Sequence, residues 1–454
     1  MLKVLKPLQS PLLEWVIFLV LKQASGVAQA EPSNFPRPDF PIPDGTVFSL
    51  LATNDVIYVG GGFQMVRNRA RPYLAALGVQ DGKLLTWDPD VKGPVTAMAI
   101  SGNTVYAGIR GTNAIGAFDI KTGQRPSAWA GFIPTFAIEG FLSRVNAVTV
   151  EQGRVYLSGE VMERLIYALD PVSGAVLSWN PNELDQSVGD HGDSIQVLGN
   201  VVYVAGKFLV LGGQSRTNLA ALDRDTAAAL PWDPAPNGRV RSMVISSNLL
   251  FVGGEFTKIG GQSCNGLAAI DLVTGDVTAW DPCGTNQNTI RLLAVESNKV
   301  YVVGTFHQIG GQSRTNLAAL DVDTGDATGW NPSMANLPQP PVADVTNQIN
   351  ALAVSGDTVY VGGGLHFPIN GSSYPYLGVF PPRGWSVLSQ ARFTNGNFSF
   401  RLLGEEGSNY VIQASATLTN WLSVYTNSVA NGAFGYSEPA TNKSVRYYRA
   451  VSRQ

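Results

Sequence analysis

The chain has 454 residues, of which 44% are hydrophobic and only 14% are charged, with a formal net charge of −3. It is too long for one ordinary domain of roughly 100–200 residues, and its apolar content is enough for a sizeable core. The weak acidic balance, without a basic block, argues against nucleic acid or an anionic membrane surface as the partner.

The first 30 residues are typical of a secretory signal peptide. Lys3 and Lys6 give a positive start, residues 15–21 form an unbroken apolar run, and an Ala-Gln-Ala motif precedes Glu31. The run is shorter than the about 20 residues that span a bilayer. We therefore predict a leader over residues 1–30, a secreted, periplasmic or cell-surface location, and no membrane insertion. The alternative is an N-terminal extension without structure.

A Trp-x-Pro motif or a relative of it recurs along most of the chain. The tryptophans are spaced by 42, 50, 53, 48 and 50 residues, at Trp87, Trp129, Trp179, Trp232, Trp280 and Trp330. A period of about 50 residues is typical of a propeller blade, here of four short strands that we name a to d. A repeated Asp-x-x-Thr-Gly turn joins strands c and d, because Asp caps its own backbone and Gly accepts a positive φ.

Strand b is the clearest element of each repeat. It is predicted seven times, at residues 56–60, 104–108, 154–159, 201–206, 249–254, 299–304 and 358–363. Radial repetition of such strands leaves few exposed sheet edges. We therefore predict an all-β chain with a seven-bladed β-propeller of four-stranded blades over residues 31–388. Six blades with one degenerate repeat is the alternative.

The N-terminus is expected to close this ring. Residues 41–47 match the connection at residues 234–240, so Phe40 stands where Trp232 stands. The residues before Phe40 should form an outer strand that completes the last blade beside residues 377–380. Residues 384–388 are the competing segment.

Two blocks of the repeat carry a resemblance to a known family. Residues 253–262 read Gly-Gly-Glu-Phe-Thr-Lys-Ile-Gly-Gly-Gln, and residues 306–314 read Phe-His-Gln-Ile-Gly-Gly-Gln-Ser-Arg. They resemble the delta-60 repeat of bacterial β-propellers, while the Gly-Gly after strand b and the Trp of strand d are kelch-like. The Leu-Ala-Ala-Leu-Asp-x-x-Thr-Gly stretch is similar to quinoprotein-type blades. The resemblance implies the fold and no shared activity, since one fold hosts many functions. Repeats two and three lack the Ile-Gly-Gly-Gln loop.

The two cysteines, Cys264 and Cys283, are predicted to form a disulfide. Their midpoint falls in the turn between strands c and d of repeat five, so they should lie opposite each other. Export would place them in an oxidising compartment, where such bonds persist. The absence of a Cys-x-x-Cys motif disfavours a redox role.

From residue 389 to 454 the pattern changes to short alternating stretches with polar turns. Residues 397–402 and 410–414 alternate between apolar and polar, and Trp421 marks a further strand. This period of two predicts half-buried strands and hence a small β-sandwich. The Gln-Ala-Ser and Asn-Trp motifs resemble C-terminal fibronectin-like modules of secreted bacterial proteins, which implies attachment, spacing or sorting.

Strand order decides which loops share a face. If strand b ends at one face, strand c starts there and strand d returns there, so b–c loops and d–a connections lie together. Repeats two and three have short b–c loops, bounded by Gly108 and Ile115 and by Gly159 and Ile166. We expect an off-centre ligand surface over them, because concave sites pair apolar surface with a few polar groups. Alternatively, the long neighbouring connections fill the gap.

The candidate ligand residues come from two long d–a connections that border this gap. They are Phe132, Phe136, Phe141 and Arg144 in the first, and Asp185, Asp190, His191 and Asp193 in the second. The first connection supplies an apolar lip and the second an acidic lip. The acidic connection also suits calcium, which prefers carboxylate oxygens, but it lacks the spacing of an EF-hand. A solvated loop is the simpler interpretation.

All three histidines, His191, His307 and His366, belong to the loop-rich face. Imidazoles bind copper and iron, yet the other ligands of a kelch-fold copper oxidase are missing, and solvated histidines are the simpler interpretation. The chain has no Gly-x-Ser-x-Gly elbow, no His-Glu-x-x-His motif and no phosphate-binding loop. We predict no catalytic residues and no cofactor, and leave a metal open.

Arg71, Arg216 and Arg314 occupy equivalent places before strand c, with Cys264 there in repeat five. A residue that recurs in several blades is expected to be structural, so each arginine should pair with a carboxylate such as Asp88. The tryptophans should likewise pack between blades, because a buried aromatic contributes a large apolar area.

Three functions stay open for the exported chain. The first is a binding or scaffold protein whose loop-rich face recognises a protein or a polysaccharide, favoured by the regular repeat, the leader and the extra module. The second is an enzyme that acts on sugars or polymers at the same face. The third is a structural component of the envelope. We expect a monomer.

Overall fold

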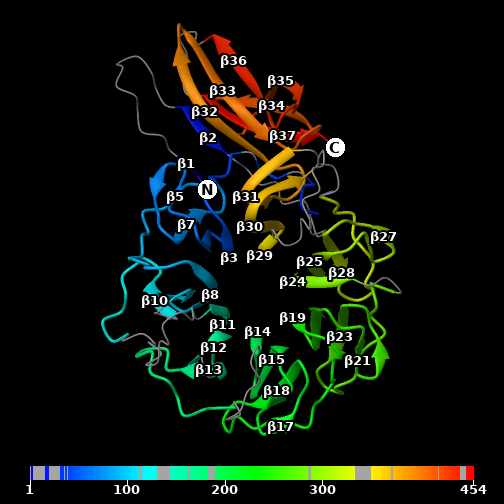
Figure 1. The fold of residues 1–454 in the computed structure, drawn as a ribbon. Helices are drawn as coiled ribbons and strands as arrows, with labels where there is room; N and C mark the ends of the chain where they lie inside the picture. Colours follow the sequence, from blue (N-terminus) through cyan, green and yellow to red (C-terminus); the bar gives the residue numbers. More distant parts are fainter. Residues whose placement is uncertain are drawn as a thin grey trace. The chain divides into compact units, whose positions relative to one another are not determined.

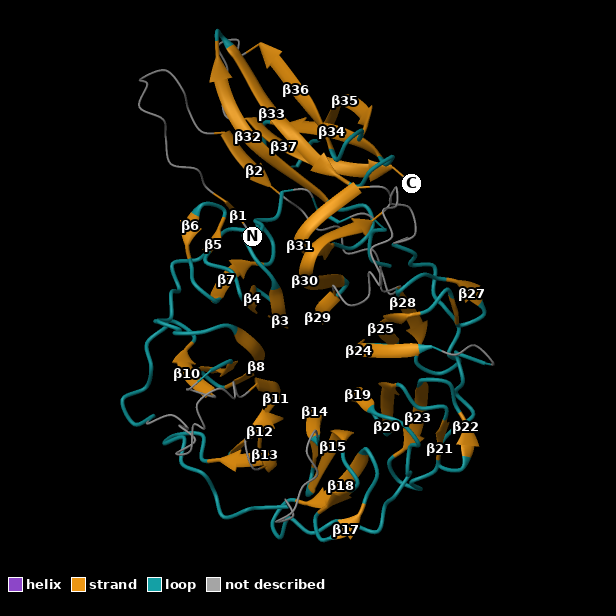
Figure 2. Cartoon of the chain, viewed as in Figure 1, coloured by secondary structure: helices purple, strands orange, loops and turns teal. Residues whose placement is uncertain are grey.

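The structure is a computed structural model, and it describes residues 2–3, 16–19, 31–34, 36–37, 39–111, 115–129, 144–161, 164–181, 190–284, 288–332, 349–369, 372–417, 419–439 and 446–453. The regular elements of these residues are strands (Figure 2). No helix in the described part of the chain is long and apolar enough to cross a membrane. The chain divides into a ring unit, Phe40–Gly378, and a terminal unit, which combines Met1–Asp39 with Val379–Gln454.

The ring unit contains seven three-stranded antiparallel sheets in its described residues, which we number one to seven in chain order. The inner strands are β3 (Val47–Ala52), β8 (Val95–Ser101), β11 (Arg144–Glu151), β14 (His191–Leu198), β19 (Val240–Ser246), β24 (Thr289–Glu296) and β29 (Ile349–Ser355). The middle strands are β4 (Val56–Gly61), β9 (Thr104–Ile109), β12 (Arg154–Val161), β15 (Val201–Lys207), β20 (Leu249–Gly254), β25 (Lys299–Thr305) and β30 (Thr358–Ile369). The outer strands are β7 (Leu74–Gly78), β10 (Ile115–Asp119), β13 (Arg164–Leu169), β18 (Leu219–Asp223), β23 (Leu267–Asp271), β28 (Leu317–Asp321) and β31 (Ser372–Phe380).

The inner strands contact one another in cyclic order. The contacts run from β3 through β8, β11, β14, β19 and β24 to β29, and β29 contacts β3 again. Figure 1 shows the sheets following one another around a circle. Radial repetition of small antiparallel sheets defines a β-propeller. The prediction of an all-β propeller is therefore confirmed.

Close contact between neighbouring sheets explains glycines that recur in the middle strands. A Cβ built on Gly60 would lie 2.6 Å from Cγ1 of Val95, and one built on Gly362 would lie 2.4 Å from Cγ1 of Val47. The β-branched side chain of the next inner strand thus fills the space that a side chain would need. Because Gly362 belongs to sheet seven and Val47 to sheet one, the same contact closes the ring.

Each predicted strand d ends in an aromatic residue that joins two sheets. The rings lie edge-on to an aromatic ring of the same sheet at centroid distances of 4.9–5.6 Å, in the pairs Trp87–Tyr58, Trp129–Tyr106, Trp179–Tyr156, Trp232–Tyr203, Trp280–Phe251 and Trp330–Tyr301. The indole N–H of Trp87 donates to the carbonyl oxygen of Asp119 in the next sheet at 2.8 Å. Trp179 and Trp280 repeat this contact. The predicted packing of tryptophans between blades is confirmed.

Strand d itself is reduced to a single β-bridge in five of the sheets. The bridges are Leu77–Leu84, Leu169–Val176, Leu222–Ala229, Ile270–Val277 and Leu320–Ala327. The prediction of four full strands per blade is therefore wrong for these sheets. After the bridge the chain turns to place its tryptophan on the next sheet, and the proline that follows has no N–H to continue a ladder.

Phe40 takes the place of such a tryptophan in sheet seven. It is only 5% exposed, and its ring lies edge-on to Tyr360 with the centroids 6.4 Å apart. A Cβ built on Gly82, in the c–d turn of sheet one, would lie 3.1 Å from Cδ2 of Phe40, and Gly275 has the same relation to Trp232. Phe40 thus has the contacts of a strand-d tryptophan, and closure of the ring by the N-terminus stays a prediction.

The residues before Phe40 run beside the end of β31. The backbone N–H of Arg37 donates to the carbonyl oxygen of Val379 at 2.7 Å, and that of Ser33 donates to Pro381 at 2.6 Å. These contacts, together with the bridge Pro32–Pro382, fall on residues 379–383, which lie between the end of the predicted segment 377–380 and the competing segment 384–388. The contacts are separate hydrogen bonds because the prolines before Phe40 lack N–H donors. Completion of the last blade by this segment stays a prediction.

In its described residues, the terminal unit contains two sheets. One is formed by β32 (Ser386–Thr394), β33 (Asn397–Gly404) and β36 (Ala433–Pro439). The other has the order β1 (Leu2–Lys3), β2 (Val16–Leu19), β37 (Arg446–Arg453), β34 (Asn409–Ser415) and β35 (Leu422–Ser428). One apolar cluster draws Phe400 and Phe434 from the first sheet and Tyr410 and Tyr448 from the second.

Two short strands fall within the range of the predicted leader. These are β1 and β2, and β2 pairs in parallel with β37. The other residues of 1–30 lie outside the described part of the chain. Cleavage of this range stays a prediction, which sequencing of the exported chain can test.

Cys264 and Cys283 are both free and buried, so the predicted disulfide is absent. The register behind the prediction is right, because the bridge Ile270–Val277 is centred on the same turn. Pairing stops at that bridge, however, so the two cysteines do not lie on paired strands. Desolvation on burial raises the pKa of Cys283 to about 12 and also raises the pKa of Cys264.

Candidate functional site

The b–c loops and the d–a connections lie on one face of the ring unit, as the strand order predicts. A glycine N–H of a b–c loop donates to the proline carbonyl of the preceding Trp-x-Pro motif at 2.6–2.8 Å, in the pairs Gly212–Pro181, Gly260–Pro234 and Gly310–Pro282. We call this the loop-bearing face. Small hairpins rise from it in sheets one, four, five and six: β5 (Met65–Val66) with β6 (Arg69–Ala70), β16 (Val210–Leu211) with β17 (Gln214–Ser215), β21 (Lys258–Ile259) with β22 (Gln262–Ser263), and β26 (Gln308–Ile309) with β27 (Gln312–Ser313).

The predicted ligand residues are described only in part. Those outside the described residues are Phe132, Phe136, Phe141 and Asp185. Arg144 is exposed at the start of β11, in sheet three. Asp190 precedes β14, and His191 and Asp193 lie in its first residues, so the structure brings these three together in sheet four.

The carboxylate of Asp193 links three neighbouring sheets. It accepts two hydrogen bonds of 2.6 Å from the guanidinium group of Arg239, which precedes β19. Nδ2 of Asn146, in sheet three, lies 3.5 Å from Oδ1 and donates to the carbonyl oxygen of Gly192 at 3.0 Å. Nε2 of His191 lies 3.7 Å from Oδ2. With a side chain only 9% exposed, Asp193 is engaged within the ring.

A hollow of about 610 Å³ opens on the loop-bearing face between sheets four and five. Its charged lining residues are Asp190, Lys207, Arg239 and Glu255. Asp193 holds Arg239, and Glu255 accepts a hydrogen bond of 2.6 Å from Nε of Arg241. Asp190 and Lys207 form no ion pair with another described residue. One charge of each sign is therefore available to a ligand.

An exposed apolar side chain completes the lining of the hollow. Leu209 is 60% exposed and lines it, and the neighbouring Val210 is 40% exposed. Counted from the phenylalanine that starts each b–c loop, the place of Leu209 is taken by Thr257 in sheet five and by His307 in sheet six. Leu209, Lys207 and Glu255 are not among the ligand residues predicted from the sequence. Leu209 stands out when the repeats are aligned, because the residues at the equivalent place in sheets five and six are polar.

No three His, Cys, Asp or Glu side chains gather as a metal site within the residues that the structure describes. His307 is exposed beside β26, while the side chain of His366 and residues 182–189 lie outside the described part. The calcium, copper and iron hypotheses stay predictions.

The recurring arginines make a structural contact, as predicted. Arg71 lies 3.2 Å from Asp88, and Arg216 lies 3.7 Å from Asp233. Each arginine also donates to a backbone carbonyl of strand d, in the pairs Arg71–Leu85, Arg216–Leu230 and Arg314–Thr328. These side chains hold the b–c loop to its own blade.

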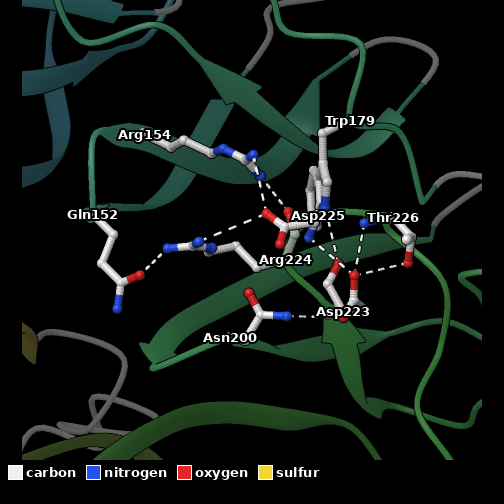
Figure 3. A network of polar contacts seen from close by, with 8 residues as sticks. All are labelled: Gln152, Arg154, Trp179, Asn200, Asp223, Arg224, Asp225 and Thr226. Carbon is white, nitrogen blue, oxygen red and sulfur yellow. Dashed lines mark hydrogen bonds and ion pairs between the residues drawn. The ribbon is translucent and has the colours of Figure 1, made fainter.

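The opposite face carries a polar network that joins sheets three and four (Figure 3). Arg154 donates to the backbone carbonyl of Arg224 and lies 3.4 Å from Asp225. Arg224 in turn donates to the side chain of Gln152. Because these charged groups bind one another across the two sheets, the network stabilises the ring.

The repeated sheets form a ring whose loops and hollow lie on one face, which defines the chain as a β-propeller built from sequence repeats. The repeat family described as outer membrane protein assembly factor BamB matches residues 49–281 and, in a second overlapping match, residues 139–364. These matches span more than half of the chain, which therefore belongs to this family. No curated protein matches the chain.

Solved structures share the fold at low sequence identity. The extracellular domain of the one component system BT4673 from B. thetaiotaomicron is 14% identical with a TM-score of 0.51, over 90% of this chain and 56% of that chain. The extracellular domain of the hybrid two component system BT4673 from the same organism is 13% identical with a TM-score of 0.51, over 87% of this chain and 54% of that chain. This chain thus spans about half the length of either.

Proposed function

We propose that this is an exported binding or scaffold protein that recognises a protein or polysaccharide ligand in the hollow between sheets four and five. The observation that carries the proposal is the lining, where the charges of Asp190 and Lys207, which form no ion pair with another described residue, stand beside the exposed side chain of Leu209. Concave sites that combine apolar surface with a few polar groups are typical of ligand recognition. Membership of the BamB family and the two extracellular-domain neighbours are compatible with a binding role.

The proposed site adjoins the surface that the sequence predicts over sheets two and three. Asp190 belongs to the second of the two long connections that border that surface. We therefore keep Phe132, Phe136, Phe141 and Arg144 as candidates for a ligand that extends from the hollow.

The proposal includes finer features of architecture and location. Seven sheets in cyclic contact support a seven-bladed propeller over residues 31–388. The repeat motifs of the sequence support its assignment to the delta-60, kelch-like kind. Two sheets around one core support a fibronectin-like β-sandwich over residues 389–454. The leader pattern of residues 1–30 supports export to a secreted, periplasmic or cell-surface location.

Photo-crosslinking tests for a protein ligand. A photo-reactive amino acid at position 209 should capture one defined partner in the producing cells. The same group at Gln64, which is exposed at the equivalent hairpin position of sheet one, is the matched control. Partner capture should weaken when Lys207→Ala is added to the 209 variant.

A glycan array tests for a polysaccharide ligand with the full exported chain. The wild type should bind a defined glycan, and Leu209→Asn with Lys207→Ala should lower the affinity at least about tenfold, as loss of central contacts does. Absence of ligand in both formats would overturn the proposal. So would equal capture at positions 209 and 64 together with unchanged glycan binding by the double variant.

A further inference from the structure

The outer face of the β32-β33-β36 sheet carries two arginines that have no counter-charge among the described residues. Arg392 pairs with Ser399 across β32 and β33, and Arg401 lies two residues further along β33. Both side chains are exposed, and neither forms an ion pair with another described residue. Diagonal neighbours of this kind lie about 7–8 Å apart at Cα, so the two positive charges repel each other across the sheet.

The acidic side chain of this sheet is on the opposite face and is already engaged. Glu438 alternates with the outward-facing Ser437, and its carboxylate accepts hydrogen bonds from the hydroxyl groups of Tyr436 and Tyr448 in the core. The outward positions that pair with the arginines are Ser389, Ser399 and Gly435. The face therefore offers cations and neutral hydrogen-bonding groups.

The two arginines flank a hollow of about 600 Å³ on this face. Gly435 lies opposite Arg401 and is exposed, and a Cβ built there would have open space around it. Gln390, Ser399 and Ser437 line the rest of the rim. A register shift between Ser389 and Arg392 marks a β-bulge, which bends β32 at this point. The lining also includes Phe400, Phe434 and Tyr436, whose side chains are buried, so polar side chains and Gly435 form its exposed part.

We propose that this face binds a polysaccharide that carries carboxylate groups, and that it attaches the protein to such a polymer. A guanidinium group binds a carboxylate through two parallel hydrogen bonds, and two of them can bind successive acidic sugars. The serine and glutamine side chains suit sugar hydroxyl groups, and the glycine lets a flat ring approach the backbone. The hollow has the volume of sites that hold small ligands, roughly 300–1,000 Å³.

The chemistry of the face favours an acidic glycan over other anionic partners. It presents no exposed aromatic ring on which a nucleic acid base would stack, within the described residues. Among its described side chains it also presents no large exposed apolar group that would insert into a lipid surface. The site is separate from the hollow of the ring unit, so the two proposals can fail independently.

Affinity electrophoresis of the full chain tests the proposal, with polygalacturonate as the acidic probe and dextran as the neutral one. The wild type should be retarded by polygalacturonate and not by dextran. Arg392→Gln with Arg401→Gln should weaken the binding at least about tenfold, because both charge-assisted contacts are lost. The control pair Arg69→Gln with Arg125→Gln removes two exposed charges from the ring unit and should bind like the wild type.

Several outcomes would overturn the proposal. They are no retardation of the wild type by polygalacturonate, unchanged retardation of the double variant, or equal loss in the control pair. Polyphosphate and heparin serve as further probes, and binding to either one without binding to polygalacturonate would also overturn it. Unchanged thermal unfolding of both double variants confirms that exposed side chains, and not the fold, are being tested.

Discussion

Truncation of Phe40 measures how strongly the N-terminus closes the ring. In Phe40→Ala the chain loses an aromatic side chain that is 5% exposed and contacts sheets seven and one. Removal of a buried Phe side chain costs about 3–5 kcal/mol. The ring unit spans Phe40–Gly378, and at about 2.1 cal/mol/K per residue its unfolding entropy makes each kcal/mol worth about 1.4 °C. The Tm should therefore fall by about 4–7 °C.

Differential scanning calorimetry of the purified chain is the assay, with Phe40→Trp as the control. Trp is the residue that the other repeats carry at this place, so this variant should keep the Tm within about 2 °C of the wild type. A Tm that is unchanged in Phe40→Ala would refute the role of Phe40. A fall of equal size in both variants would show that the position, and not the aromatic contact, matters.

Three further predictions concern the thiols, the turns and the leader. Burial raises the pKa of Cys283 to about 12, which keeps its thiol neutral. A thiol reagent at pH 8 should therefore label neither of the two buried cysteines in the folded chain. Both cysteines should react once the chain is unfolded without reductant. Backbone hydrogen bonds lower the pKa of the turn carboxylates of Asp119, Asp170, Asp223 and Asp271. The stability that these carboxylates contribute should therefore be complete above about pH 4 and be lost as the pH falls through the lowered pKa values. The urea midpoint should be lower at pH 3 than at pH 7, and Asp271→Asn should make this difference smaller. N-terminal sequencing of exported protein should start at Glu31, and an intact Met1 would contradict the leader.

The parts of the fold that depend on local chemistry could be predicted from the sequence. Strand b, the Asp-x-x-Thr-Gly turns and the aromatic at the end of strand d repeat every 50 residues or so, and the structure has them where the period places them. Even the substitution of Phe40 for a tryptophan followed from its flanking motif. The extent of strand d could not be predicted in this way. The packing of its terminal aromatic residue against the next sheet outweighs pairing within its own sheet.

The disulfide prediction failed for the same physical reason, because packing and not register ended the pairing of strand d. The hairpin register was predicted correctly, as the bridge Ile270–Val277 shows. The prediction then assumed that pairing continues along both arms to Cys264 and Cys283. Burial of Trp280 against Phe251 takes the second arm away from the ladder instead. A register fixes which residues would face each other, and packing decides whether they do.

The site was harder to predict because its groups come from different repeats. Asp193 looked available in the sequence, yet its partner Arg239 lies 46 residues away in the next sheet. In a propeller a side chain on an inner strand meets the neighbouring sheet before it meets solvent, so its availability depends on a residue one period later. Recurring residues, such as the arginines before strand c, belong to the fold for this reason. A departure from the repeat at an exposed place, as at Leu209, is the better guide to a ligand, because no contact within the ring requires it.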